Sequence, residues 1–597
     1  MKKLLAILLI FTLTISLSSA QFQNYRKVEI KAVAVTSGEK PTGVIINITV
    51  IVTPGKGKVF VSTTPFTEID MQGSAQLAAI TACDLLGIDF TKHDFFYIIE
   101  ADAPIVGGPS AGGVMTVATI AALKGLKIHE SVYMTGMIFP DGFIGPVGGL
   151  KYKLEAAAKD GGKVFLIPKG QRVTYVEEKK VRRVGIINII TTEYKKVDLV
   201  EYGKKIGINV YEVGTINDAL RFYTGYEIKK PEVNFSIGEY SELLKTLAIE
   251  MKRALQDLID ETSFKLSDEI KQIIASGDGF YRSGEYYTAT SKYFQAKISI
   301  RFELYKNKIQ TAKQFDDEVE KITNEIKKLK DYLAKEKIGV NSFQIIAAAQ
   351  ERVGEAEKLL DDSLNAKSDE SALYYLAYAK ERVESAKIWL TLLPHLRSDY
   401  EIPNEEIQKR AQFYISQAKS LVVYASSLNG DQTLLSKSLD TISIAKRLYA
   451  DGFFAGASMT AVSALTDASL SIETKYGDIS TKIDEVRNAA KASLAEAEKS
   501  LFPILPAAYY EYAENLENKY AKIMYYTLSE RLAKLLSVIA KVNVGKEIIH
   551  TGFPKIQQIK APKRSRIEEM VVEAPGFEIC LVVLALAVLA VTYRRVK

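Results

Sequence analysis

From about residue 236 to residue 542, apolar residues recur at intervals of three and four, which places them on one face of an α-helix. Short polar breaks such as SGDG, NAKSDES and LNGDQ interrupt this spacing and are typical of turns between helices. About half of the 597-residue chain must therefore bury its apolar surface by packing helix against helix. The pattern predicts an all-α region over residues 236–548.

Two stretches of this region resemble each other. DGFYRSGEYYTATSKYFQAKISI (278–300) and DGFFAGASMTAVSALTDASLSI (451–472) each have DGF, a glycine and then a Thr-Ala pair on a helix. Small residues at helix crossings with aromatics between them suit stacked helical hairpins that resemble tetratricopeptide arrays. They suit one long irregular bundle equally well, and the sequence leaves both arrangements open.

The residues before this region follow a different pattern. Residues 28–66 alternate β-branched and polar residues in three stretches separated by turns, as in a β-meander. A helix over 74–88, the apolar strand FFYII and the helix GVMTVATIAALKGL follow. Two strands, SVYMTGMI and KVFLIP, flank the helix LKYKLEAAAKDGG, and residues 172–208 insert a strand pair and a charged helix. We therefore expect a mixed α/β (α+β) domain over residues 21–226.

The first twenty residues, MKKLLAILLIFTLTISLSSA, combine two lysines, a 14-residue apolar stretch and small residues before Gln21. This layout predicts a secretory signal peptide over residues 1–20 that is cleaved after Ala20. A retained N-terminal membrane helix is the alternative.

The other end of the chain carries a second apolar segment, at residues 578–593, closed by a basic tail at 594–597. The segment is just long enough to span a bilayer, and the basic residues predict that the tail stays inside the cell. Residues 549–577, rich in Lys and Pro, are expected to form a stalk. The tripeptide PGF at 575–577 resembles the archaeal PGF-type sorting tail, which implies cleavage there and attachment to lipid. A buried core helix is the other reading of the apolar segment.

Charge and cysteine content exclude several classes of protein. The formal net charge is +6, and five positive charges lie in the two terminal segments, so the rest of the chain is nearly neutral. A nucleic-acid partner is therefore not expected. Cys83 lies in a predicted helix and Cys580 in the apolar C-terminal segment, so the two cannot form a disulfide framework or a metal site. We expect no cofactor and no metal.

The motif GGPSAGG at 107–113 holds Ser110 between a proline and small residues, where the hydroxyl packs no core. A nucleophilic serine needs a base to take its proton. The chain has only four histidines, and none has a motif around it, so a histidine triad is poorly supported: His93, His129, His395 and His550.

A lysine can act as the base if burial lowers its pKa. In GFIGPVGGLKYKL, Lys151 follows two glycines that permit a tight turn, and it lies at the start of a helix, whose positive potential disfavours the ammonium form. We therefore expect Lys151 to be the base. Lys153, two positions on, is expected to point to another face of the helix and into solvent.

Four motifs in this order and spacing resemble the Lon-type protease domain, over roughly residues 28–226: GPSAG (108–112), MTG (134–136), PVGGLK (146–151) and VFLIP (164–168). The resemblance implies that Ser110 is the nucleophile and Lys151 the general base of a Ser-Lys dyad. It also implies that Thr135 lies near the lysine and that backbone N–H groups around Ser110 bind the oxyanion. The remaining supporting positions are Gly108, Pro109, Ala111, Gly112, Gly148 and Gly149.

The chain departs from the family at several points. Gly107 and Met137 replace an aspartate before the serine and a glutamate after MTG, which leaves a pseudoenzyme as an alternative. Family members carry an ATPase module before this domain, but no such length precedes residue 28 and no GxxxxGK[ST] occurs. We therefore expect cleavage without nucleotide. Lon-type domains often form hexameric rings, so homo-oligomerisation stays open.

Together these features predict an ATP-independent, extracytoplasmic, membrane-tethered serine endopeptidase that cleaves unfolded or flexible polypeptides. A cell-surface helical scaffold with a vestigial or self-processing protease domain is the first alternative. An envelope-binding or adhesion protein is the second. The sequence names neither a substrate nor a specificity pocket.

Overall fold

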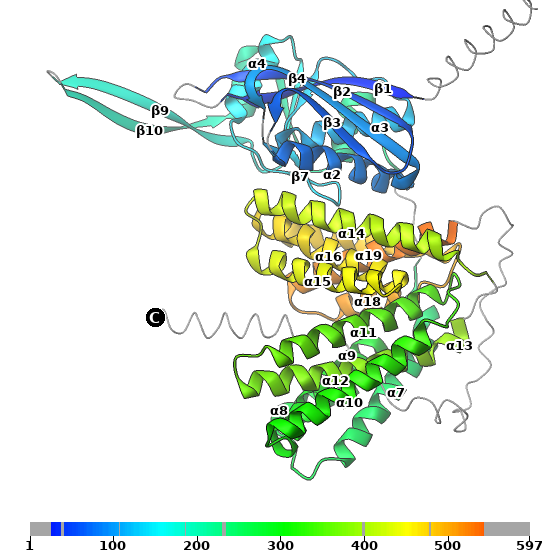
Figure 1. Cartoon of the computed structure of the whole chain (residues 1–597). Coiled ribbons are helices and arrows are strands. Elements are labelled where there is room, and N and C mark those ends of the chain that lie inside the picture. Colours follow the sequence, from blue (N-terminus) through cyan, green and yellow to red (C-terminus); the bar gives the residue numbers. More distant parts are fainter. Residues whose placement is uncertain are drawn as a thin grey trace, which may run out of the picture. The chain divides into compact units, whose positions relative to one another are not determined.

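The structure is a computed structural model that describes residues 25–36, 41–67, 69–106, 108–184, 187–229, 235–396, 400–476 and 479–541. The chain divides into two compact units (Figure 1): Met1–Lys229 with Val423–Gly430 and Lys475–Gly477, and the remaining residues. The predicted signal peptide, stalk, apolar C-terminal segment and basic tail lie outside the described residues. Within the described ranges, no helix has the length and apolar character needed to cross a bilayer.

The first unit is the predicted mixed α/β domain. In chain order its elements are β1 (Arg26–Val35), β2 (Gly43–Pro54), β3 (Val59–Thr67), α2 (Ile69–Leu86), η2 (Phe90–Lys92), β4 (His93–Val106), η3 (Pro109–Ala111), α3 (Gly112–Lys124), β5 (Val132–Met134), β6 (Met137–Ile138), β7 (Ile144–Gly145), α4 (Leu150–Lys159), β8 (Val164–Pro168), β9 (Val173–Val184), β10 (Ile187–Asp198), α5 (Leu199–Ile206), β11 (Asn209–Val213) and α6 (Ile216–Thr224).

The main sheet has the strand order β1-β2-β4-β3. The predicted meander is therefore wrong at its third strand, because β3 pairs in parallel with β4 and not with β2. Parallel neighbours need a crossover, and α2 supplies it between β3 and β4. Phe60 of β3 is 44% exposed and stacks on its register partner Phe96 with ring centroids 4.7 Å apart, as suits an edge strand.

A second sheet positions the helix that carries the two candidate lysines. Its order is β11-β8-β5, with both pairs parallel. Leu150 and Leu154 of α4 pack into one buried cluster with Phe165 of β8 and Ile208, which precedes β11. Because residues three and four apart share a helix face, this packing fixes the rotation of α4 about its axis.

The insertion predicted over residues 172–208 consists of the antiparallel hairpin β9–β10 and the helix α5. Asp198 ends the hairpin and caps α5, accepting hydrogen bonds from the N–H groups of Val200 and Glu201. Figure 1 shows that the hairpin extends away from the two sheets of this unit.

Apart from an isolated β-bridge between Gly339 and Glu401, the second unit contains only helices among its described residues. They are η4 (Ile237–Tyr240), α7 (Ser241–Asp260), α8 (Asp268–Arg282), α9 (Tyr286–Lys308), α10 (Ala312–Leu333), α11 (Phe343–Leu364), α12 (Asp369–Thr391), α13 (Leu393–Leu396), α14 (Asn404–Ser427), α15 (Gln432–Ala450), α16 (Phe454–Tyr476), α17 (Ile479–Glu498), α18 (Ile504–Glu514) and α19 (Lys519–Lys541).

These helices favour the bundle over the repeat array, because the second unit closes on itself. The buried Glu511 carboxylate of α18 accepts hydrogen bonds from the N–H groups of Tyr287 (2.8 Å) and Thr288 (3.0 Å), at the start of α9. Tyr240, the last residue of η4, packs its ring on Phe502, which precedes α18, with ring centroids 4.5 Å apart. In a linear array each repeat contacts only its neighbours in sequence, and these contacts join segments more than 200 residues apart.

Candidate active site

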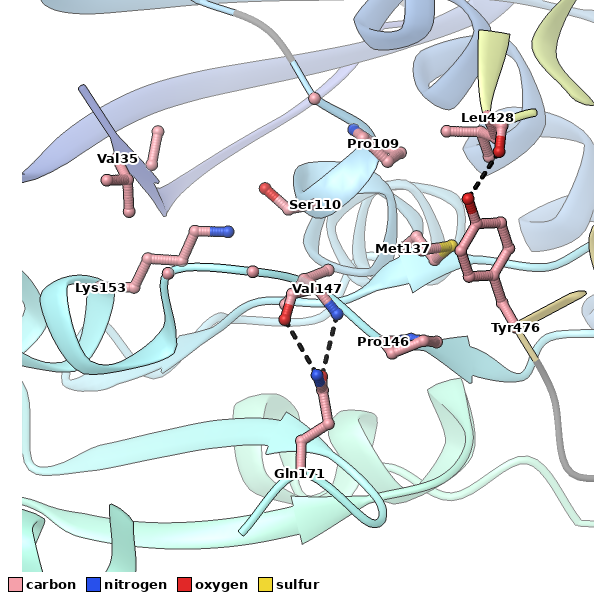
Figure 2. Close-up of a pocket in the computed structure, with 14 residues that line it drawn as sticks. Val35, Pro109, Ser110, Met137, Pro146, Val147, Lys153, Gln171, Leu428 and Tyr476 are labelled. Carbon is pink, nitrogen blue, oxygen red and sulfur yellow. Dashed lines mark hydrogen bonds between the residues drawn. The ribbon is translucent and has the colours of Figure 1, made fainter. Parts of the chain in front are cut away.

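A pocket in the first unit contains Ser110. Its walls come from the end of β1, the turn η3, Met137 of β6, the segment 146–149 and the first turn of α4, together with Gln171 from the loop between β8 and β9. Figure 2 shows the side chains of Ser110 and Lys153 pointing toward one another across this pocket. The structure thus brings one hydroxyl and one primary amine together.

Ser110 sits in a turn whose backbone is fixed on both sides. Gly108, at φ +92°, is the N-cap of η3, and the left-handed sign of this angle favours glycine. The carbonyl of Ser110 accepts a hydrogen bond from the N–H of Gly136 at 2.9 Å. Gly112 and Gly113 follow, and a Cβ on Gly112 would lie 2.7 Å from the Ile138 side chain, so this close approach requires glycine.

The helix α3 begins directly after this turn, at Gly112. The Gly113 N–H in its first turn donates to the Gly136 carbonyl at 3.0 Å, and the helix dipole adds positive potential at this end. Negative charge that develops on a substrate carbonyl oxygen beside Ser110 would therefore be stabilised.

The lysine in the pocket is Lys153. Its residue is 5% exposed, and its Nζ donates a hydrogen bond to Thr135 Oγ1 at 3.2 Å. Burial disfavours the ammonium form and lowers the pKa of Lys153 from 10.5 to about 8. At pH 7, about a tenth of such a lysine is neutral and able to accept a proton.

The geometry favours Lys153 over Lys151, the residue predicted as the base. Lys151 does not line the pocket, and its Nζ lies 3.4 Å from the Glu155 carboxylate and 5.5 Å from the centre of the Tyr202 ring. The expectation that Lys153 is solvated is wrong. Residues i and i+2 of a helix are rotated by about 200° about its axis, so when one of these lysines faces the pocket the other cannot.

A sequence signal for Lys153 exists but was missed. Leu150, Lys153, Leu154 and Ala157 have the spacing i, i+3, i+4 and i+7, and all four are buried. Lys153 therefore belongs to the apolar stripe of α4. Burial lowers the pKa of a lysine inside such a stripe, a shift that a lysine on the solvent-facing side of the helix does not experience.

Thr135 contacts both the backbone of Ser110 and the Lys153 amine. Its side chain is fully buried, and its hydroxyl accepts from Lys153 Nζ and lies 3.4 Å from the carbonyl of Ser110. The structure thus places Thr135 beside a lysine, as the resemblance implied, although that lysine is Lys153.

The glycines before α4 shape the same pocket. Gly148 and Gly149 both line it, as do Gly108 and Pro109, while Ala111 is buried beside Ser110 in η3. Gly149 has φ +69°, and a Cβ there would lie 2.6 Å from Cγ2 of Val35. Only glycine suits this position.

The pocket also includes residues outside the four sequence motifs, among them Val35 and Gln171. Val35 comes from the end of β1, while Val147 and Gln171 are joined by two hydrogen bonds. The Val147 N–H donates to Gln171 Oε1, and Gln171 Nε2 donates to the Val147 carbonyl, both at 2.9 Å (Figure 2). Gln171 thereby anchors the segment that leads into α4.

His93, His129 and His395 lie outside the pocket. No group of three or more His, Cys, Asp or Glu side chains within the described ranges is placed to hold a metal ion.

Comparisons with known proteins agree with the geometry. Residues 17–201 match the model of the Lon protease (S16) C-terminal proteolytic domain. The Lon protease of Azospirillum brasilense is 34% identical over 172 residues, which are 27% of this chain and 21% of that protein. That of Escherichia coli K12 is 38% identical over 133 residues, or 21% and 17% of the two chains.

The chain therefore spans only about a fifth of the length of these relatives. The matched residues include Ser110 and Lys153. Residues 17–201 of this chain are therefore similar to the Lon protease C-terminal proteolytic domain.

Proposed function

We propose that the first unit is a serine endopeptidase with Ser110 as nucleophile and Lys153 as general base. The observation that carries the proposal is the pocket shared by the Ser110 hydroxyl and the buried Lys153 amine. Burial lowers the pKa of Lys153 to about 8, which provides a neutral amine near physiological pH.

In the first step, Ser110 Oγ attacks the carbonyl carbon of a peptide bond while neutral Lys153 takes the hydroxyl proton. Thr135 holds the amine through the 3.2 Å hydrogen bond. Backbone N–H groups around Ser110 stabilise the oxyanion. The Lys153 ammonium then returns the proton to the leaving amine, the C–N bond breaks, and an ester on Ser110 remains.

In the second step, neutral Lys153 takes a proton from a water molecule that attacks this ester. The second tetrahedral intermediate collapses, and Lys153 returns the proton to Ser110 Oγ. The carboxylic acid product leaves, and the enzyme is restored with no net change in the protons on Ser110 or Lys153.

We also propose that cleavage is independent of ATP and takes place outside the cytoplasm. The sequence contains no GxxxxGK[ST] motif, and the apolar segments at 4–17 and 578–593 suit export and tethering. Unfolded or flexible polypeptides are the proposed substrates, because an enzyme that uses no ATP has no supply of energy for unfolding a stable protein.

The test is casein cleavage by the full-length protein in detergent, with and without ATP, comparing wild type with Ser110→Ala, Lys153→Met and Lys151→Met. We expect loss of cleavage in the first two variants, retention in Lys151→Met, and no effect of ATP. Loss in Lys151→Met with retention in Lys153→Met would reverse the assignment of the base. No cleavage by folded wild type would favour a scaffold or adhesion role for the helical unit.

A further inference from the structure

One polar contact to the Ser110 turn comes from outside the four family motifs. Asp70, in the first turn of α2, accepts a hydrogen bond through Oδ1 from the N–H of Gly108 at 3.0 Å. The contact spans 38 residues and ends two positions before Ser110. Asp70 does not line the pocket, so it contacts the nucleophile's backbone turn and not the reacting atoms.

The turn needs such a contact because Gly108 offers little local restraint. Gly108 combines φ +92° with ψ 146°, and it has no side chain with which to cap η3. Glycine can leave this conformation at small steric cost. On the far side of the turn, the Gly136 N–H holds the Ser110 carbonyl at 2.9 Å. Asp70 supplies the matching restraint on the near side.

The acceptor is a carboxylate, which makes the bond a strong one. Hydrogen bonds to charged groups are roughly twice as strong as those between neutral groups. The first turn of a helix, where Asp70 lies, is also a favourable place for a negative charge.

We propose that Asp70 is a positioning residue for Ser110. Its carboxylate fixes the Gly108 N–H and thereby sets the placement of Ser110 Oγ relative to the Lys153 amine. The inference rests on the proposed serine peptidase activity and adds to it a residue from a separate helix.

Two substitutions separate geometry from charge. Asp70→Asn keeps an acceptor oxygen but removes the charge, whereas Asp70→Ala removes both. Asp84→Ala is the matched control, since Asp84 is an exposed aspartate at the other end of the same helix. All are made in the full-length protein and measured by kcat and KM on a fluorogenic casein peptide, by the rate of Ser110 labelling with a fluorophosphonate, and by thermal unfolding.

We expect Asp70→Ala to lower kcat and the labelling rate about 10- to 100-fold, the equivalent of one charge-assisted hydrogen bond, with KM nearly unchanged. Asp70→Asn should stay within about threefold of wild type, because a neutral acceptor still serves the Gly108 N–H. The pH profile of Asp70→Asn should match that of wild type, and Asp84→Ala should behave as wild type.

A wild-type kcat in Asp70→Ala would overturn the inference, as would equal losses in Asp70→Asn and Asp70→Ala. If Asp70→Ala does not fold, Asp70→Ser replaces it, because the shorter hydroxyl cannot reach Gly108 and the same loss is expected. A wild type that neither cleaves the peptide nor reacts with fluorophosphonate would instead refute the proposed function, which keeps the two failures distinct.

Discussion

Lys153 Nζ donates to Thr135 Oγ1 at 3.2 Å, in a part of the first unit where both side chains are buried. The hydroxyl orients the amine without supplying a negative charge. Burial therefore lowers the pKa of Lys153 to about 8 with no opposing ion pair. This relationship gives the site a pH dependence, a cost in stability and a dependence on one hydroxyl group, each of which can be measured.

The first prediction concerns pH. Because only the neutral amine accepts a proton, kcat/KM should rise with pH and level off above about 8, the pKa of Lys153. Below that value, activity should fall about tenfold for each pH unit. Initial rates of peptide cleavage from pH 6 to 10 test this. An acid limb of the kcat/KM profile centred near pH 6.5 would point to a histidine and contradict the assignment of Lys153 as the base.

The second prediction is that Lys153 lowers the stability of the folded domain. At pH 7 the folded state must bury a charged Lys153, whereas the unfolded chain keeps the ordinary pKa of 10.5. Lys153→Met should therefore stabilise the domain by up to about 3 kcal/mol at pH 7 while it abolishes cleavage. Denaturant unfolding of wild type and variant provides the measurement.

The sign of this effect can be checked with pH. Between about pH 8 and 10.5 the unfolded chain binds a proton that folded Lys153 lacks, so wild-type stability should rise with pH. The advantage of Lys153→Met should thus shrink to below about 1 kcal/mol at pH 10. An advantage that stays constant from pH 7 to 10 would show that the lysine is not titrating.

The third prediction concerns the Thr135 hydroxyl. Thr135→Val keeps the shape of the side chain but removes the acceptor for Lys153 Nζ, and we expect kcat to fall about tenfold. Loss of an acceptor that favours the ammonium should also move the acid limb of the pH profile to lower pH. Thr135→Ser should restore both quantities. Equal activity in the Val and Ser variants would show that the Thr135 hydroxyl does not contribute to catalysis.

The fourth prediction concerns the anchor of the segment before α4. Gln171→Met removes two 2.9 Å hydrogen bonds to Val147 and should lower kcat about five- to tenfold, because the segment carries Lys153 into place. Gln72→Met, at an exposed position of α2, serves as the control. An unchanged kcat in Gln171→Met, with normal folding, would show that α4 holds its position without this anchor.

Some of the site could be predicted from sequence because its residues are close together in the chain. GPSAG places Ser110 on a glycine-bounded turn, and the structure has that turn as η3. The choice between Lys151 and Lys153 depended on which face of α4 is buried. To choose correctly, one must recognise that Leu150 and Leu154 mark the buried face of α4 and that Lys153 lies on that face.

Other features depended on pairings that local patterns do not specify. Three alternating strands in a row suggested a meander, but the apolar strand β4 inserts between β2 and β3. Phe95, Tyr97 and Ile99 are each at most 1% exposed, so this strand belongs in the middle of the sheet. Likewise, Asp70 and Gln171 reach the site across 38 and 24 residues, and no short motif contains such contacts.

The closure of the helical unit has a consequence for how the chain is made. The first turn of α9 has no side-chain cap of its own, and Glu511, 224 residues later, accepts the N–H of Tyr287. During synthesis the beginning of α9 lacks the Glu511 carboxylate until α18 has emerged from the ribosome, about 10 to 45 s later at typical elongation rates. Contacts this distant in sequence make assembly slow. The helical unit must therefore remain incomplete for most of its own translation, and a chain truncated before α18 would leave the beginning of α9 without its partner.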